Sequence, residues 1–200
     1  MTAVPATSPS RRGLPARLIG DWTIGFLVFL SGFVIVEPAP YDLVLCGVMA
    51  VWAFCGFTIS RPILPLVVLL IFYCAGGLLS FTQIKDFSES FVYWATTLFL
   101  VLQCIFFAGV VPVDPKRRFN VIAKAYIASA VVASLFGILG YFGAIPYASL
   151  FTLYDRARGT FQDPNVFAPF LVLPLVVLAR AMLTRPFAEG LMRAPALLII

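Results

Sequence analysis

Two arginines stand among turn-forming residues between two long apolar segments of the chain. Residues 156–165 read RARGTFQDPN, with guanidinium groups at Arg156 and Arg158. Arginine binds phosphate oxygens through two parallel hydrogen bonds. Asp163 is a good N-cap and Pro164 a good first helical residue, so the next helix should begin here with its free N–H groups facing the arginines. The stretch therefore suits the binding of an anion such as a phosphate or diphosphate.

The loop that carries these arginines, residues 142–163, also contains aromatic residues at Tyr147, Phe151 and Tyr154. Aromatic rings can stack on sugars while guanidinium groups bind phosphates, so Tyr147 and Tyr154 are candidate sugar-stacking residues for a sugar diphosphate.

A second interpretation of this loop is equally open on physical grounds. The rings would form an aromatic belt at the membrane interface, and the arginines would pair with Asp155 and Asp163. The predicted helix start at Pro164 favours the anion-binding interpretation, although an ionised Asp163 already uses part of the positive field there.

The composition indicates an integral membrane protein. The 200-residue chain is 62% hydrophobic and 12% charged, whereas soluble domains carry about 25% charged residues. Residues 1–16 are rich in Pro, Ser, Thr and Arg and contain no apolar core, so they predict a disordered cytoplasmic tail and not a cleavable signal peptide. The pI of 9.2 follows from the loop charges described below and gives no argument for a nucleic-acid partner.

Six apolar runs of 19 to 21 residues fit the roughly 30 Å core of a bilayer as α-helices: 18–36, 41–59, 63–81, 91–111, 121–141 and 164–183. A seventh run, 194–200, is too short to span. The runs lack the alternation typical of membrane β-strands. We therefore predict an all-α, polytopic transmembrane helix bundle over residues 17–200, with six complete spans and the start of a seventh, as an incomplete transmembrane domain.

The loop charges predict the orientation. Of the fourteen Lys and Arg residues, eleven fall in one alternate set of loops: Arg11, Arg12, Arg17, Arg61, Lys116, Arg117, Arg118, Lys124, Arg180, Arg185 and Arg193. The other set holds only Lys85, Arg156 and Arg158. Positive residues concentrate in cytoplasmic loops, so the N-terminus is predicted inside and the 142–163 loop outside.

Other polar and small residues inside the runs suit packing better than chemistry. All four cysteines, Cys46, Cys55, Cys74 and Cys104, lie inside predicted spans; they have no CxxC spacing, and the chain has no histidine, so a zinc site has almost no support. Gln103 is the one strongly polar side chain predicted at depth, and we expect it to bond to another helix. Small residues in the fifth run predict close helix packing: Ala130, Ala133, Ser134, Gly137 and Gly140.

Two features near the ends of spans complete the pattern. Lys124 should extend its ammonium group to the headgroups. Pro169 and Pro174 interrupt the last complete run, so its outer part could form a separately oriented half-helix.

Residues 156–168 resemble the R-x-x-G-T-F-x-D/N-P-N-x-x-A motif of the O-antigen ligase and O-antigen polymerase superfamily. The resemblance is local; the preceding residues are similar to the family only in hydropathy and span spacing. It implies a bacterial inner-membrane glycosyltransferase of the GT-C kind, independent of metals and cofactors, that acts in lipopolysaccharide or other polysaccharide biosynthesis. The implied partners are an undecaprenyl-diphosphate-linked saccharide, a lipid or saccharide acceptor and the bilayer.

The resemblance also implies roles for individual residues. Arg156 would contact the donor diphosphate, and Arg158 and Asn165 of the same motif would assist in binding it. A catalytic histidine is implied in a large periplasmic loop, which this sequence lacks. We therefore expect a fragment of such a ligase or polymerase that is inactive alone. A membrane transporter lined by the kinked helix and Gln103, or a non-catalytic membrane assembly subunit, remains open as an alternative.

Overall fold

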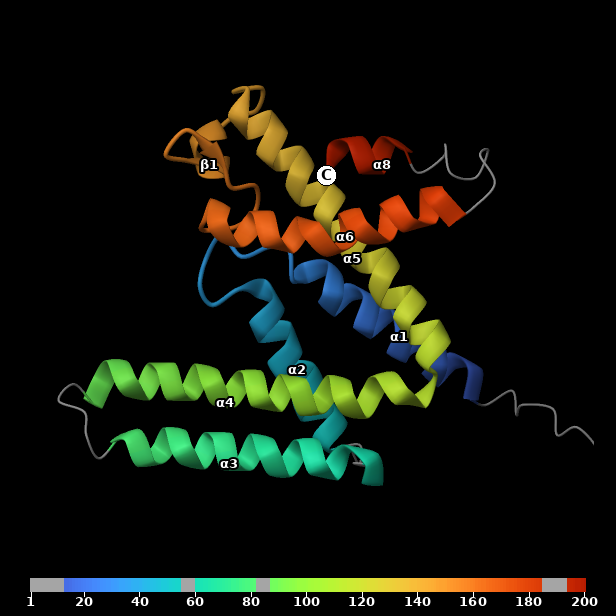
Figure 1. Ribbon diagram of the computed structural model, residues 1–200, viewed down its shortest axis with the longest axis vertical. Helices are drawn as coiled ribbons and strands as arrows, with labels where there is room; N and C mark the ends of the chain where they lie inside the picture. Colours follow the sequence, from blue (N-terminus) through green and yellow to red (C-terminus); the bar gives the residue numbers. More distant parts are fainter. Residues whose placement is uncertain (1–12, 55–59, 82–86, 185–193) are drawn as a thin grey trace, which may run out of the picture. The chain divides into compact units, whose positions relative to one another are not determined.

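The computed structural model of the chain describes residues 13–54, 60–81, 87–184 and 194–200. Within these ranges the secondary structure is α-helical apart from short 3-10 turns, one two-stranded hairpin and one isolated bridge (Figure 1). The chain forms two compact units, which we describe separately. Unit 1 consists of Met1–Val44 with Arg117–Ile200, and unit 2 consists of Leu45–Lys116.

Each apolar run of the sequence contains a helix, which confirms the all-α prediction. The helices are α1 (Gly13–Leu30), α2 (Pro40–Phe54), α3 (Leu64–Ser80), α4 (Phe87–Val110), α5 (Pro115–Tyr141), α6 (Pro164–Thr184) and α8 (Ala194–Ile199). The 3-10 turn η1 (Arg61–Ile63) precedes α3, and η3 (Val111–Val113) follows α4.

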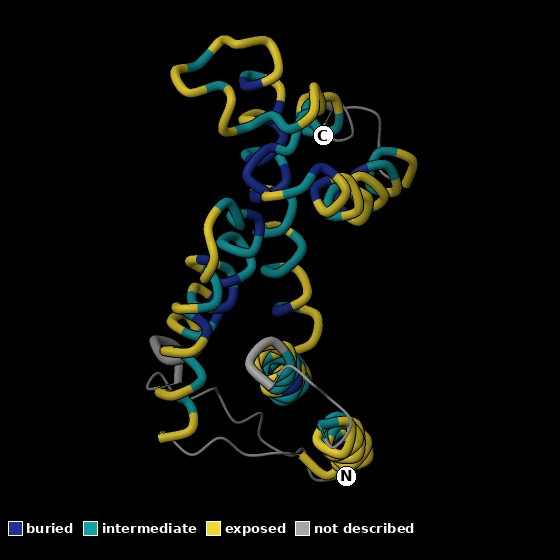
Figure 2. The backbone as a smooth tube through the Cα atoms, turned by 90° about the vertical axis from the view of Figure 1, so that its left-hand side faces the viewer, coloured by how far each residue is buried: buried dark blue, intermediate teal, exposed yellow. Residues whose placement is uncertain are grey.

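Four helical segments in the described part of the chain are long and apolar enough to cross a membrane: Arg61–Ser80, Ser90–Val113, Pro115–Tyr141 and Pro164–Thr184. Leu18–Leu30 and Pro40–Phe54 are apolar but shorter. Between 6% and 28% of the apolar window of each long helix is buried, and Figure 2 shows most helical turns as intermediate or exposed. Such exposed apolar surface is typical of helices that face lipid.

The first predicted span ends earlier than its hydrophobicity suggests. The run 18–36 is helical only to Leu30, because the following backbone pairs with a segment far along the chain. Val34 forms a parallel bridge with Phe161, and the Val34 N–H donates to the Thr160 carbonyl at 2.8 Å. Gly32 allows the same segment to pass close to Ser129, since a Cβ at position 32 would overlap the Ser129 hydroxyl.

In unit 1, α1 and α5 run in the same direction. Gly25 of α1 lies against Val121 of α5, 3.2 Å from the position of a Cβ. Further along both helices, Ser129 Oγ donates to the Phe29 carbonyl at 2.7 Å. The two helices therefore begin at the same end of this unit, as the alternation of predicted loops requires.

α6 crosses the small-residue face of α5 at an angle (Figure 1). The five small residues predicted to permit close packing, Ala130, Ala133, Ser134, Gly137 and Gly140, are all buried. A Cβ on Gly137 would lie 3.4 Å from the Phe167 ring, while Tyr126, earlier in α5, bonds to Phe170, later in α6. The small residues are thus buried as predicted, but the loop covers part of this face: a Cβ on Gly140 would overlap Phe151, and one on Gly137 would lie 3.5 Å from the Gly159 Cα.

The predicted break in α6 is not observed. The helix is continuous from Pro164 to Thr184 with Pro169 and Pro174 inside it. Proline at 174 removes the N–H that would have bonded to the Phe170 carbonyl. Tyr126 replaces this donor, because its hydroxyl donates to the Phe170 carbonyl at 2.8 Å.

In unit 2, α3 and α4 lie side by side and antiparallel (Figure 1). Trp94 of α4 packs on Gly77 and makes an edge-to-face contact with Phe81, with ring centroids 6.3 Å apart.

Gln103 is half-buried and makes no hydrogen bond to any described residue, so its predicted bond to another helix is not found.

The described cysteines Cys46, Cys74 and Cys104 are free thiols, and Cys46 and Cys104 are exposed. Cys55 falls outside the described residues.

Candidate functional site

The 142–163 loop contains a short turn-rich structure before the arginines. A 3-10 turn, η4 (Ala148–Phe151), leads into strand β1 (Thr152–Leu153), which pairs antiparallel with β2 (Arg156–Ala157). Tyr154 and Asp155 join the strands with φ values of 51° and 57°, the geometry of a type I′ hairpin turn. The hairpin places Arg156 immediately beyond this tip.

Arg156 is exposed and reaches the start of α6. Its Nη1 donates to Asn165 Oδ1 at 3.2 Å. The Asn165 N–H in turn donates to Asp163 Oδ1 at 2.7 Å, so the Asp163 carboxylate caps the helix. The predicted helix start at Pro164 with Asp163 as its cap is confirmed. These bonds bring Arg156, Asn165 and the helix N-terminus together.

Arg158 is held differently from Arg156. It is half-buried, its Nε donates to the Leu150 carbonyl at 3.2 Å and its Nη1 donates to the Gln162 carbonyl at 3.1 Å. A guanidinium group that donates to two backbone carbonyls has fewer N–H donors left for an anion than a free one has. Arg158 therefore braces the loop from inside.

The residues after Arg158 anchor the loop in the helices. Gly159 has a φ of +56°, and a Cβ there would lie 2.7 Å from the Ala133 carbonyl. Thr160 is 2% exposed, and its hydroxyl donates to the Gly32 carbonyl. Phe161 joins a buried cluster with Ala133 and Phe167.

Sequence reasoning found the motif but not this anchoring role. The glycine at position 159 is the feature of the sequence that points to this role, since glycine adopts a left-handed conformation at no steric cost.

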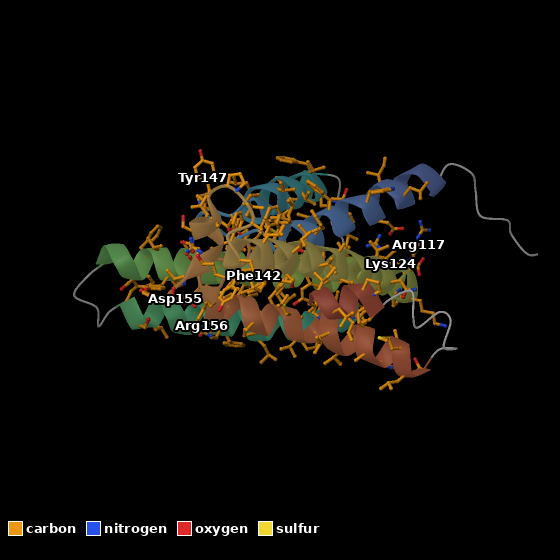
Figure 3. The ribbon with its side chains drawn as sticks, turned by 90° about the horizontal axis from the view of Figure 1, so that it is seen from above. Arg117, Lys124, Phe142, Tyr147, Asp155 and Arg156 are labelled. Atoms are coloured by element: carbon orange, nitrogen blue, oxygen red, sulfur yellow. The ribbon has the colours of Figure 1, made fainter. Side chains whose placement is uncertain are left out.

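The candidate stacking residues do not form one platform. Tyr154 is 87% exposed at the hairpin tip next to Arg156, and Tyr147 is 80% exposed with a φ of 58°. In Figure 3, Tyr147 lies on the other side of the loop from Asp155 and Arg156. Phe151 points inward, stacked on Phe136 with centroids 5.1 Å apart.

The acidic residues of the loop are not ion-pair partners of the arginines. Within the described part of the chain, neither Arg156 nor Arg158 forms a salt bridge with Asp155 or Asp163. The Asp–Arg pairing of the alternative interpretation is thus not found. Arg156 keeps an exposed positive charge beside the start of α6.

Unit 1 carries polar residues at two ends. Tyr147, Asp155 and Arg156 lie toward one end, and Arg117 and Lys124 lie toward the other (Figure 3).

Among the described residues, no group of three or more His, Cys, Asp or Glu side chains is placed to hold a metal ion. The chain matches no protein-family model, no curated protein and no solved structure.

Proposed function

We propose that the chain forms the donor-binding part of an O-antigen ligase-like glycosyltransferase in a bacterial inner membrane. Its substrate would be a saccharide linked to undecaprenyl diphosphate, and its product a ligated or polymerised surface polysaccharide. The proposal includes six membrane spans, a cytoplasmic N-terminus and a loop at 142–163 on the periplasmic face.

The observation that carries the proposal is the exposed guanidinium group of Arg156 beside the N-terminus of α6. Arg156 Nη1 contacts Asn165 Oδ1 at 3.2 Å, and Asn165 lies in the first turn of the helix. A diphosphate bound there would accept hydrogen bonds from Arg156 and from the Asn165 amide group, and it would gain from the helix dipole.

The other predicted site residues take distinct roles in this proposal. Arg158 fixes the loop through its bonds to the Leu150 and Gln162 carbonyls, so that it supports donor binding through Arg156. Tyr154, at the hairpin tip, is the better placed ring for a sugar adjoining the diphosphate. Tyr147 would contact a more distant part of the saccharide.

Catalysis needs a base that accepts the proton of the attacking hydroxyl. The chain contains no histidine, and the carboxylate of Asp163, which precedes α6, is used as the helix cap. We therefore assign donor binding to these residues, and not proton transfer.

Binding of an undecaprenyl-diphosphate saccharide to the chain in lipid nanodiscs tests the proposal. Replacing Arg156 with Ala removes a charge-assisted bidentate contact, so the dissociation constant should rise by about tenfold to a hundredfold. Arg156→Lys should also bind more weakly than wild type, because an ammonium group cannot form the planar fork. Arg180→Ala, an exposed arginine later in α6, is the matched control. Equal affinities of the wild type and both Arg156 variants would refute the donor site.

A further inference from the structure

A groove in unit 1 runs between the first halves of α1 and α5, at the opposite end from the arginine loop. It has a volume of about 640 Å³ and includes Trp22, Phe26 and Phe29 from α1 among its walls. These rings recur at spacings of four and three residues, so they follow one face of the helix for roughly 10 Å. Trp22 is 78% exposed and Phe26 is 53% exposed. The groove is thus an apolar channel open at its side.

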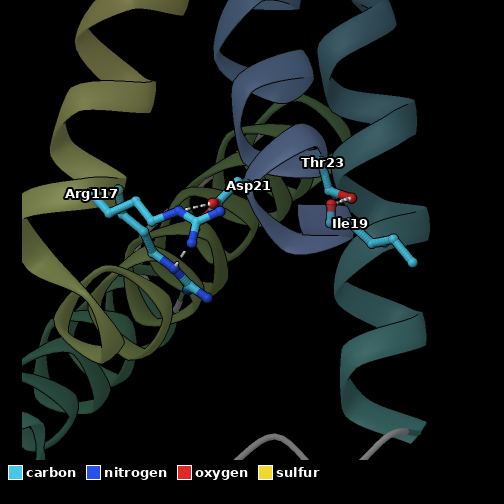
Figure 4. Close-up of polar contacts among 5 residues, drawn as sticks. Ile19, Asp21, Thr23 and Arg117 are labelled. Atoms are coloured by element: carbon cyan, nitrogen blue, oxygen red, sulfur yellow. Dashed lines mark hydrogen bonds and ion pairs between the residues drawn. The ribbon is translucent and has the colours of Figure 1, made fainter. Parts of the chain in front are cut away.

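Charged groups mark one end of this groove. Asp21 and Lys124 both line it. Asp21 is 9% exposed and pairs with Arg117, whose Nε lies 2.5 Å from Asp21 Oδ2 (Figure 4). The Nε of Arg118 lies 4.0 Å from the other carboxylate oxygen. One carboxylate thus faces two guanidinium groups, and Lys124 adds a further positive charge to the groove lining, which leaves an excess of positive charge.

The length of α5 places these cations near a membrane surface. Its 27 residues extend for about 40 Å, roughly 10 Å more than the hydrocarbon core. If Tyr141 ends the helix at one interface, Pro115 to Val121 extends into the other headgroup layer. Lys124 then lies within one helical turn of that layer, which its flexible side chain can reach.

The combination of an apolar side channel with a cationic end matches the shape and charge of an anionic phospholipid. We propose that this groove binds one such lipid, with its headgroup phosphate at Lys124, close to Trp22, and an acyl chain along Phe26 and Phe29. Pairing with Asp21 holds the Arg117 side chain at the same end of the unit as Lys124, where its charge adds to the local positive charge (Figure 3). A zwitterionic lipid fits the channel equally well but gains less from the excess charge.

Quenching of Trp22 fluorescence by brominated lipids tests this site in the full chain. The substitutions Trp52→Phe and Trp94→Phe leave Trp22 as the fluorescent reporter. The protein is reconstituted in phosphatidylcholine that contains about 10 mol% of one brominated lipid. Brominated phosphatidylglycerol should bind beside Trp22 about fivefold more strongly than brominated phosphatidylcholine, as expected for about one additional cation.

The variant Lys124→Gln removes the cation without unpairing the buried Asp21, and it should abolish the preference for the anionic lipid. Arg180→Gln, an exposed arginine on α6, should retain it. Three outcomes would overturn the proposal: equal quenching by the two lipids, a preference unchanged by Lys124→Gln, or protection of Trp22 from both lipids. The last would mean that a protein segment or a second copy covers the groove. Circular dichroism of each variant verifies that the helices remain folded.

Discussion

At the residue scale, Gly159 holds the arginine loop against α5. Its φ of +56° lies in the left-handed region, and a Cβ would lie 2.7 Å from the Ala133 carbonyl and 2.9 Å from the Phe167 ring. A substitution therefore adds both backbone strain and overlap with a buried backbone atom.

Gly159→Ala should lower the free energy of unfolding by about 3 kcal/mol, as measured by denaturant unfolding in detergent micelles. Gly143 supplies a matched control, because it has a φ of +66° but nothing within 4 Å of its Cβ position. Gly143→Ala should therefore cost only the conformational part, about 1 kcal/mol. Equal losses for the two variants would show that the contact with Ala133 contributes nothing.

Arg156 and Arg158 show what residue types alone can and cannot predict. Their identity indicated anion binding, and the Asp163 cap and Pro164 helix start followed from local preferences. The bonds of Arg158 to the Leu150 and Gln162 carbonyls depend on how the loop folds back on itself. No local preference distinguishes the two arginines, so their different environments emerge only in three dimensions.

At the element scale, α6 depends on a donor from its neighbour α5. Pro174 removes the N–H that would bond to the Phe170 carbonyl, and the Tyr126 hydroxyl donates to that carbonyl at 2.8 Å. The bond links two helices and satisfies a backbone group that has no water available in a bilayer.

Tyr126→Phe should destabilise the chain by about 1 kcal/mol in detergent unfolding measurements, because it leaves the Phe170 carbonyl unpaired. Tyr141→Phe, a change on the same helix at an exposed tyrosine, should be nearly neutral. A double-mutant cycle with Pro174→Ala decides the question, because Ala at position 174 restores the backbone N–H that can donate to the Phe170 carbonyl. If Tyr126→Phe costs as much with Ala at 174 as with Pro, the hydroxyl does not serve this carbonyl.

Hydrophobicity predicted where helices form, but not where α1 ends. Residues 31–36 continue the apolar run, but they contain Gly32 and three β-branched residues, which favour an extended backbone, and Val34 pairs with Phe161 across the unit. The hairpin tip was also unpredictable, because Tyr154 and Asp155 both adopt positive φ values that only tertiary context enforces. The sequence did not predict a buried carboxylate at Asp21, since its partner Arg117 is distant in sequence.

At the scale of the whole molecule, the two polar ends of unit 1 agree with an alternating membrane topology. α1 and α5 begin at the end where Arg117 and Lys124 lie, and the arginine loop lies at the other end (Figure 3). The charge distribution predicts that the Arg117 end is cytoplasmic. Donor binding from the periplasm requires the opposite end to face outward.

Cysteine labelling at Gln162 tests the orientation and the donor site together. Gln162 is exposed in the loop, and its side chain has no assigned role in binding. In a background without native cysteines, Gln162→Cys should react with a membrane-impermeant maleimide added from the periplasmic side. An undecaprenyl-diphosphate saccharide should slow that reaction, and Arg156→Ala should remove the protection. Labelling from the cytoplasmic side alone, or a rate that the saccharide leaves unchanged, would contradict a periplasmic diphosphate site at Arg156.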